Sequence, residues 1–244
     1  MSSFRTALLV TASTALSLAA TPAALADPLT FTSKTSGYSG LASNSLLGVY
    51  TNCNNIYAAT NNNGLSISTN GGGNWTTYKT TNGLGSNSLR GVYASGNNIY
   101  AATSAGVSIS TNSASSWTNY TNSNTSGGLG NGTVTGIYAI GSNIYASIDG
   151  GGISVSRNNG SSWSNYTTTN GLGNNRVIGV YASDSKVYAA TFGGGGVSIA
   201  SDPNQLPLNQ VPGPLPLFGA VSAFGFSSKL RRRLRAAASV SPCC

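Results

Sequence analysis

The sequence has very little charge and no histidine. Charged residues make up 7% of its 244 residues, and its acids are the four aspartates Asp27, Asp149, Asp184 and Asp202. Without histidine, neither a Ser-His-Asp triad nor a Cys-His pair can form. The acids are also too few and too scattered to supply the two flanking carboxylates of an ordinary glycosidase. These absences predict that the protein has no catalytic residues and is not an enzyme.

Cysteine is also scarce, and the glycine runs lack the partners that phosphate loops need. Cys53, Cys243 and Cys244 cannot build a regular disulfide framework, and they are not spaced like zinc ligands. We expect Cys53 to be a small, partly buried residue near a turn. The glycine runs 71–73, 150–152 and 193–196 are not followed by the Gly-Lys-Ser/Thr of a phosphate loop. The sequence therefore predicts no metal site and no cofactor.

The net charge of +8 is concentrated near the ends of the chain. Arg5 lies near the start and five basic residues lie within 229–235, so that six basic residues oppose four acids elsewhere. A protein that binds nucleic acid needs basic residues spread over a docking face. No nucleic-acid partner is expected.

Residues 1–26 have the pattern of a secretory signal peptide. Arg5 precedes an apolar stretch over 7–20, and the small residues Ala24 and Ala26 flank Leu25 directly before Asp27. We expect cleavage before Asp27 and export of the protein, so that it is secreted, extracellular or held at the outer cell surface. The alternative is a helix retained at the mature N-terminus.

The C-terminal region 206–235 combines a Pro-rich linker, a short apolar segment and an arginine cluster. The segment 217–228, "LFGAVSAFGFSS", would span about 18 Å as a helix, short of the ~30 Å hydrocarbon core of a membrane. The basic cluster would hold its own side in the cytoplasm. The features that define this region are Pro212, Gly213, Pro214, Arg231, Arg232 and Arg233. Residues 236–244 form a tail without an assigned role.

This layout resembles the PEP-CTERM sorting signals of Gram-negative-type bacteria. The resemblance implies processing by an exosortase-like membrane protease and transient anchoring in the membrane through the C-terminal helix. Pro-Gly-Pro stands here in place of the usual Pro-Glu-Pro, which is a departure from the pattern. The alternative is a simple tail anchor.

Four repeats occupy the region between these two ends. The marker Gly-Val/Ile-Tyr occurs at 48–50, 91–93, 136–138 and 179–181, at spacings of 43, 45 and 43 residues. Two further short markers, of the types "NIYAAT" and "GVSIS", follow it in every repeat, and a fourth of the type "WTNY" occurs three times. Each marker is rich in β-branched or aromatic residues and bounded by Asn, Gly and Ser, as strands of a meander are.

Four strands per unit at this period predict an all-β fold, a β-propeller of about four four-stranded blades over residues 27–205. The fourth repeat lacks its last strand because a proline-rich segment follows it. The segment 28–35, "PLTFTSKT", precedes the first repeat in the order seen inside the chain, so we expect this N-terminal strand to complete the last blade. Four blades is the lower limit for closure, which leaves an open arc or a paired assembly as alternatives.

The repeats resemble two groups of propellers. The segment 82–110 is similar to the regulator-type propellers of bacterial sensor ectodomains. The turn before each tryptophan resembles the Asp-box hairpin of sialidase-like (BNR) repeats, in which asparagine replaces the aspartate here. The residues of these turns are Asn70, Asn112, Asn158, Trp75, Trp117 and Trp163. These motifs are structural and imply no activity.

The sequence therefore predicts a non-catalytic secreted or cell-surface propeller, acting as a structural, adhesive or interaction module. Its expected partners are an exosortase-like enzyme and a polysaccharide or envelope protein. One alternative is an extracellular carbohydrate-binding module. A sialidase-like glycosidase is a weaker alternative, because the internal arginines do not recur at one position of the repeat.

Overall fold

The computed structural model describes residues 30–183 and 185–203. The chain divides into two compact units, 1–33 and 34–244, and each is described by itself below. The expected signal peptide over 1–26, with Ala24, Ala26 and Asp27, lies outside the described residues. The same holds for the expected sorting region 206–235 and the tail 236–244. Among the residues that are described, no helix is long and apolar enough to cross a membrane.

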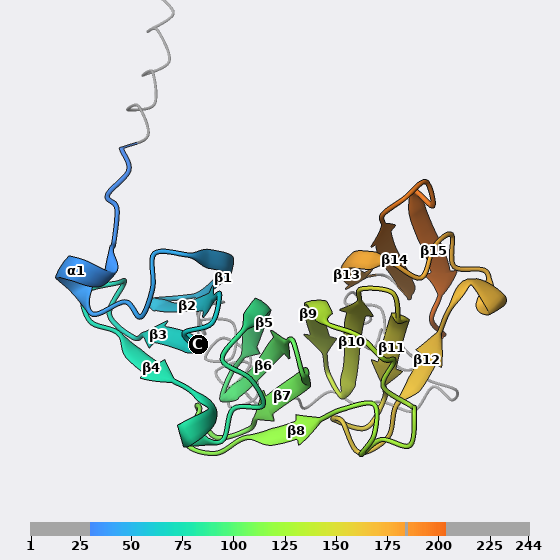
Figure 1. Cartoon of the computed structure of the whole chain (residues 1–244), viewed down its shortest axis with the longest axis horizontal. Helices are drawn as coiled ribbons and strands as arrows, with labels where there is room; N and C mark the ends of the chain where they lie inside the picture. Colours follow the sequence, from blue (N-terminus) through green and yellow to red (C-terminus); the bar gives the residue numbers. More distant parts are fainter. Residues whose placement is uncertain (1–29, 184, 204–244) are drawn as a thin grey trace, which may run out of the picture. The chain divides into compact units, whose positions relative to one another are not determined.

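The described chain forms four antiparallel sheets, each made of consecutive strands (Figure 1). The first contains β1 (Leu46–Asn52), β2 (Asn55–Thr60), β3 (Leu65–Ser68) and β4 (Thr76–Tyr78). The second contains β5 (Leu89–Ser95), β6 (Asn98–Thr103), β7 (Gly106–Ser110) and β8 (Thr118–Tyr120). The third contains β9 (Val134–Ile140), β10 (Asn143–Ile148), β11 (Gly152–Ser156) and β12 (Ser164–Tyr166). The fourth contains β13 (Val177–Ser183), β14 (Lys186–Thr191) and β15 (Val197–Ser201). We call these sheets blades 1 to 4.

The strands coincide with the sequence markers, and short turns join them. In blade 2, Ser95 pairs with Asn98 across the two-residue turn Gly96-Asn97, where Gly96 has a φ of 56°. Such a positive φ is the geometry that two-residue hairpins need and that glycine adopts without strain. A single helical turn precedes three of the blades: α1 (Ser36–Ser39), η1 (Thr80–Asn82) and η2 (Thr168–Asn170).

The innermost strands of successive blades pack directly on one another: β1 on β5, β5 on β9, and β9 on β13. At the first junction, the glycine of the Gly-Val/Ile-Tyr marker permits this close approach. A Cβ added at Gly48 would lie 2.9 Å from the Arg90 carbonyl oxygen and 3.1 Å from the Gly91 Cα. At Gly48, the requirement for glycine therefore comes from the contact between backbones rather than from a turn.

The hydrophobic core is divided into three clusters, one at each junction between blades. The junction of blades 1 and 2 buries residues that include Tyr57, Leu65, Ile67, Val92 and Ile99. The junctions of blades 2 and 3, and of blades 3 and 4, repeat the same pattern. The all-β fold of four propeller blades predicted from the repeats is confirmed.

The structure differs from the sequence-based expectation at the edge of blade 4. This sheet has three strands, residues 30–35 adopt no strand, and Phe31 is 90% exposed. The expected completion of the last blade by the segment 28–35 is therefore not present in this structure. The physical reason lies in the inner strands, because β1 and β13 do not pack on each other as the successive pairs do. Within the described residues, blades 1 and 4 do not close into a ring.

Candidate binding site

The turns before the tryptophans are held by a repeated network of hydrogen bonds. In blade 2, the Asn112 side-chain carbonyl accepts hydrogen bonds from the Ser110 hydroxyl and from the Ser116 backbone N–H, at 3.0 and 2.9 Å. The Ser110 hydroxyl oxygen in turn accepts from the Ala114 N–H at 2.9 Å. Blades 1 and 3 repeat these contacts around Asn70 and Asn158. Every polar atom named here is therefore hydrogen-bonded within its own turn.

The turns of blades 2 and 3 each place a tryptophan against the preceding blade. The ring of Trp117 in blade 2 lies 6.5 Å from that of Tyr78 in blade 1, and Trp163 in blade 3 lies 5.8 Å from Tyr120 in blade 2. Both pairs are tilted or edge-on, which aromatic rings prefer. The last tyrosine of this series, Tyr166 in blade 3, has no such tryptophan, because the sequence contains none after Trp163 and the described part of blade 4 ends with β15.

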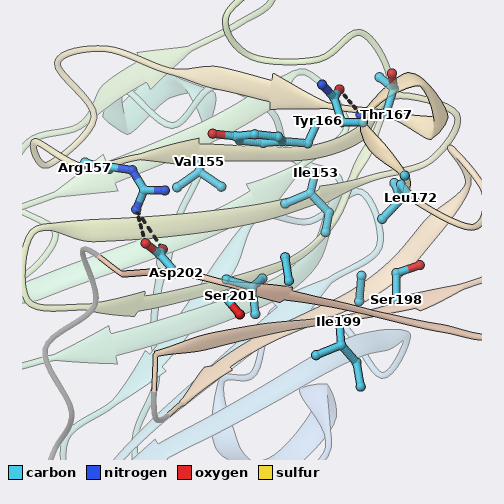
Figure 2. A pocket seen from close by; sticks show the side chains of 15 residues that line it. Ile153, Val155, Arg157, Tyr166, Thr167, Leu172, Ser198, Ile199, Ser201 and Asp202 are labelled. Atoms are coloured by element: carbon cyan, nitrogen blue, oxygen red, sulfur yellow. Dashed lines mark hydrogen bonds and ion pairs between the residues drawn. The ribbon is translucent and has the colours of Figure 1, made fainter.

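A groove with a volume of about 170 Å³ lies between blades 3 and 4, at the place where that tryptophan would be (Figure 2). Its apolar lining includes Ile153, Val155, Tyr166, Leu172 and Val187. The residues at the same repeat positions in the first junction, Leu65, Ile67, Tyr78, Leu84 and Ile99, belong to the cluster that contains Trp117. The groove is therefore the space that a tryptophan fills at the other two junctions.

The edge strand β15 extends this apolar surface. Val197 and Ile199 are 68% and 62% exposed, whereas Val107 and Ile109, at the same positions of β7, are 1% and 5% exposed. The polar group between them also differs. In blades 2 and 3, the hydroxyls of Ser108 and Ser154 donate to Asn119 and Asn165 on the fourth strand. Ser198 accepts a hydrogen bond from the Gly173 N–H, and the described part of blade 4 has no fourth strand to face it.

One end of the groove is closed by a buried carboxylate. Asp202 is 2% exposed, and its Oδ2 lies 2.7 Å from both the Arg157 guanidinium and the Tyr145 hydroxyl (Figure 2). Burial raises the pKa of Tyr145 strongly, and the hydrogen bond to Asp202 raises it further. Because Arg157 and Tyr145 belong to blade 3, these contacts fix the end of β15 to the neighbouring blade.

The role of Asp202 was missed in the sequence analysis, although a signal for it exists. Asp202 lies two residues after the strand position of Ala200, as Asn112 lies two residues after Ser110. The fourth repeat thus begins the same turn with an aspartate and then leaves the pattern at Pro203. The sequence analysis also did not identify Tyr166 as a residue of a binding site. The lack of a fourth tryptophan in the repeats could have indicated that Tyr166 is not covered by one.

The other charged and cysteine residues do not converge on a reactive centre in the described part of the chain. Arg176 forms an ion pair with Asp149 at 2.9 Å and lies 4.4 Å from the centre of the Phe192 ring. Within residues 30–183 and 185–203, no three His, Cys, Asp or Glu residues are grouped to hold a metal ion. Cys53 is exposed, not partly buried as expected, because it occupies the first position of the hairpin turn between β1 and β2.

A second hollow, of about 410 Å³, lies on the loops of blades 2 and 3. It is lined by residues of 104–106, 121–123 and 129–133, and most of its side chains carry hydroxyl or amide groups. The loop after Tyr120 is longer than its counterpart after Tyr166, since eight residues lie between Tyr120 and Leu129 and five lie between Tyr166 and Leu172. This hollow is polar, in contrast to the groove beside Tyr166.

No protein-family model and no curated relative matches this chain. Among solved structures, it resembles the extracellular domain of the hybrid two component system BT3049 from B. thetaiotaomicron, with a TM-score of 0.57 and 19% identity. That match covers 69% of this chain and 24% of the other chain. YCF48 from Cyanidioschyzon merolae follows with a TM-score of 0.45 and 13% identity, over 64% of this chain and 56% of that one. PorZ, a surface component of the type-IX secretion system of Porphyromonas gingivalis, has a TM-score of 0.46 and 14% identity, over 66% and 22%. The chain spans about a quarter of the BT3049 domain, and at these identities the likeness shows the fold alone: this chain is a β-propeller-like protein.

Proposed function

We propose that the protein is a non-catalytic propeller, secreted or displayed at the cell surface, that acts as a structural or adhesive interaction module. One observation carries this proposal: within the described residues, no strand pairs with the outer edge of β15 in blade 4, and this edge lies beside an apolar groove. An open strand edge offers backbone N–H and C=O groups to an added strand, and neighbouring pockets give such binding its specificity.

The extracellular location is supported by two independent features. The sequence begins with the pattern of a signal peptide, and the BT3049 match is described as an extracellular domain. The low content of charged residues and the lack of histidine support the proposal of a non-catalytic role. The few internal charges near the groove, Arg157 and Asp202, neutralise each other.

The sorting of the protein through its C-terminus belongs to the same proposal. An exosortase-like protease would cut within or near the Pro-rich motif 211–216, after transient anchoring through the apolar segment 217–228. Mass spectrometry of the mature protein is expected to find ends at Asp27 and within 211–216. A mature protein that retains Arg231, Arg232 and Arg233 would contradict processing and favour a simple tail anchor.

The interaction role is tested by binding of the purified protein to washed cells of the strain that produces it. We expect the Ile199→Lys variant to lose retention on the cells, because a charge on β15 opposes an added strand and its apolar contacts. The matched control is Ile178→Lys. Ile178 is also exposed, but its repeat position holds Arg90 in blade 2, so a basic residue is compatible with the fold there. Equal retention of both variants would contradict the proposal, and so would turnover of a glycoside by the purified protein.

A carbohydrate-binding module is the second candidate, and the polar hollow over 104–133 favours it. Hydroxyl and amide groups such as those of Thr121, Ser123 and Asn131 are suited to hydrogen-bond a sugar. A glycan array tests this function, with Asn131→Ala as the variant. Saturable binding that is lost in Asn131→Ala but kept in Ile199→Lys would support the carbohydrate function over the strand-edge function.

A further inference from the structure

The three junctions between blades repeat one arrangement, and the two ends of the series present its separate halves. At the junction of blades 2 and 3, Tyr100, Val107 and Ile109 of blade 2 pack against Ile137, Ile144 and Ala146 of blade 3. The equivalents of the first group in blade 4 are Tyr188, Val197 and Ile199. The equivalents of the second group in blade 1 are Val49, Ile56 and Ala58.

Each of these end faces is open in part in the described structure, although Ala58 of blade 1 is already buried, at 1% exposure. Val49 is 66% exposed, whereas Val92 at the same position of blade 2 is 8% exposed. On the other end, Val197 and Ile199 are exposed as described above. The six positions carry no charged side chain, so the two faces match each other in chemistry as well as in position.

The tyrosines of the innermost strands form a row that also ends at blade 4. The ring centres of Tyr50 and Tyr93, of Tyr93 and Tyr138, and of Tyr138 and Tyr181 are 4.9, 5.0 and 4.7 Å apart. Tyr181 ends this row and is 51% exposed. The glycines behave alike: a Cβ on Gly136 would lie 3.6 Å from the Gly179 Cα, and one on Gly179 would meet only the Ala190 Cβ at 3.9 Å.

The segment before blade 1 has the features of a fourth strand. The residue that caps α1, Thr35, is extended and is followed after the helical turn by the left-handed Gly40, as Lys79 and Gly83 flank η1. Aligned on these caps, Phe31, Ser33 and Lys34 occupy the positions of Trp75, Thr77 and Tyr78. An aromatic residue thus stands in the tryptophan position and a hydroxyl in the position that faces the central serine.

Lys34 already lies where the last residue of such a strand belongs. A Cβ added at Gly72, in the turn of blade 1, would lie 3.5 Å from the Lys34 Cγ. At the equivalent place in blade 3, a Cβ on Gly160 would meet the ring of Tyr120, the last residue of the fourth strand of the preceding blade. Lys34 therefore lies against the turn of blade 1 as the last residue of a preceding blade's fourth strand does.

The geometry points to a second copy of this chain as the occupant of both ends. Residues 31–34 of one copy add to β15 of the other as its fourth strand. Phe31 fills the groove on Tyr166, Ser33 faces Ser198, and the outer face of blade 1 covers Val197 and Ile199. The same contact made reciprocally joins two sets of four blades into a ring of eight, which is within the four to eight blades common for closed propellers. This inference rests on the proposed function of blade 4 as an interaction site and names its partner.

The test is the mass of the purified full-length chain in sedimentation velocity over a range of concentrations. We expect a species of two chains. Phe31→Asp and Ile199→Lys are each expected to weaken dimerisation about tenfold or more, since each removes a large apolar side chain from a buried contact. Phe31 is almost fully exposed in the single chain, so its replacement leaves the fold intact, which circular dichroism can check. Ile178→Lys is the matched control and should remain dimeric.

A mixture of the two variants tests the head-to-tail arrangement. Phe31→Asp keeps an intact blade 4 and Ile199→Lys keeps an intact N-terminal segment, so together they can form one complete junction. We expect the mixture to form a dimer at concentrations where each variant alone is monomeric. A monomeric wild type, open polymers larger than two chains, a dimer indifferent to Phe31→Asp, or no recovery in the mixture would each overturn the inference.

This outcome is separable from that of the cell-binding experiment. A monomeric protein whose retention on cells still depends on Ile199 would overturn the second copy as the partner and keep the interaction function. A dimer that does not bind cells would keep the second copy as the partner and overturn the proposed retention on cells.

Discussion

Cys53 occupies a position where the backbone favours glycine. Its φ is 54°, and the equivalent positions in blades 2 and 3 are held by Gly96 and Gly141, with φ of 56° and 57°. A non-glycine residue in this left-handed region costs about 1–2 kcal/mol.

We therefore predict that Cys53→Gly raises the free energy of unfolding by about 1 kcal/mol, less the larger conformational entropy of glycine in the unfolded chain. Chemical denaturation monitored by tryptophan fluorescence measures the change. Cys53→Ala serves as the control, because it removes the thiol but keeps the strained φ. If alanine stabilises as much as glycine, the thiol and not the backbone is responsible.

Asn112 illustrates a side chain whose use is local. Its carbonyl oxygen accepts from the Ser110 hydroxyl and the Ser116 N–H, and its amide donates to the Ser116 hydroxyl at 2.8 Å. We predict that Asn112→Ala destabilises the protein by about 1–2 kcal/mol, because these partners lose their hydrogen bonds.

The Asn112→Asp variant distinguishes the contribution of the side-chain carbonyl to stability from that of the amide N–H. It keeps the acceptor and loses the donor, and we expect a smaller loss of stability than for alanine in the same denaturation experiment. Equal losses in the two variants would show that the accepted hydrogen bonds contribute little.

At the scale of the element, the innermost strands depend on glycine for their approach. A Cβ at Gly48 would lie 2.9 Å from the Arg90 carbonyl oxygen, whereas one at Gly179 meets nothing closer than 3.9 Å. We predict that Gly48→Ala lowers the thermal midpoint through a strain of about 1–3 kcal/mol. Gly179→Ala, the same change in the same marker, should be nearly neutral. Calorimetry of both variants at low protein concentration makes the comparison, and similar midpoints would contradict this reading of the marker.

The sequence contained most of the information about single elements. Marker spacing predicted the strands and their grouping into blades, because strand patterns and turn residues are local signals. It also identified 28–35 as a candidate fourth strand. It could not show whether the chain closes, because closure depends on the packing angle between sheets, which side chains at every junction determine together. The groove at Tyr166 is a consequence of that missing closure.

At the scale of the whole molecule, the row of tyrosines on the four innermost strands makes the free energy of unfolding depend on pH in the alkaline range. Burial, followed by the charge of Tyr181, raises the pKa of Tyr138 to about 12 from its ordinary value of 10.0, and burial also raises the pKa of Tyr93. The folded protein thus keeps a proton on Tyr138 where the unfolded chain has already lost it. The stability from this difference is complete below pH 10 and is lost as the pH rises toward 12.

We therefore predict that the free energy of unfolding falls as the pH rises above 10, the ordinary pKa of tyrosine. Urea denaturation at a series of alkaline pH values measures the slope, and tyrosinate absorbance follows the ionisation. Tyr138→Phe should reduce the slope, because the coupled group is removed. An unchanged slope in this variant would assign the alkaline effect to other groups.

The division of the core into separate junctions has a consequence for how the molecule folds. A blade in the middle of the series shares two junctions and a terminal blade shares one, so the chain behaves as a row of units stabilised by their nearest neighbours. In the Ile199→Lys variant, hydrogen exchange should therefore be slowest in β6 and β10 and faster in β2 and β14. A chain of this kind unfolds by fraying inward from its termini, and joining its two ends would remove the places where fraying begins.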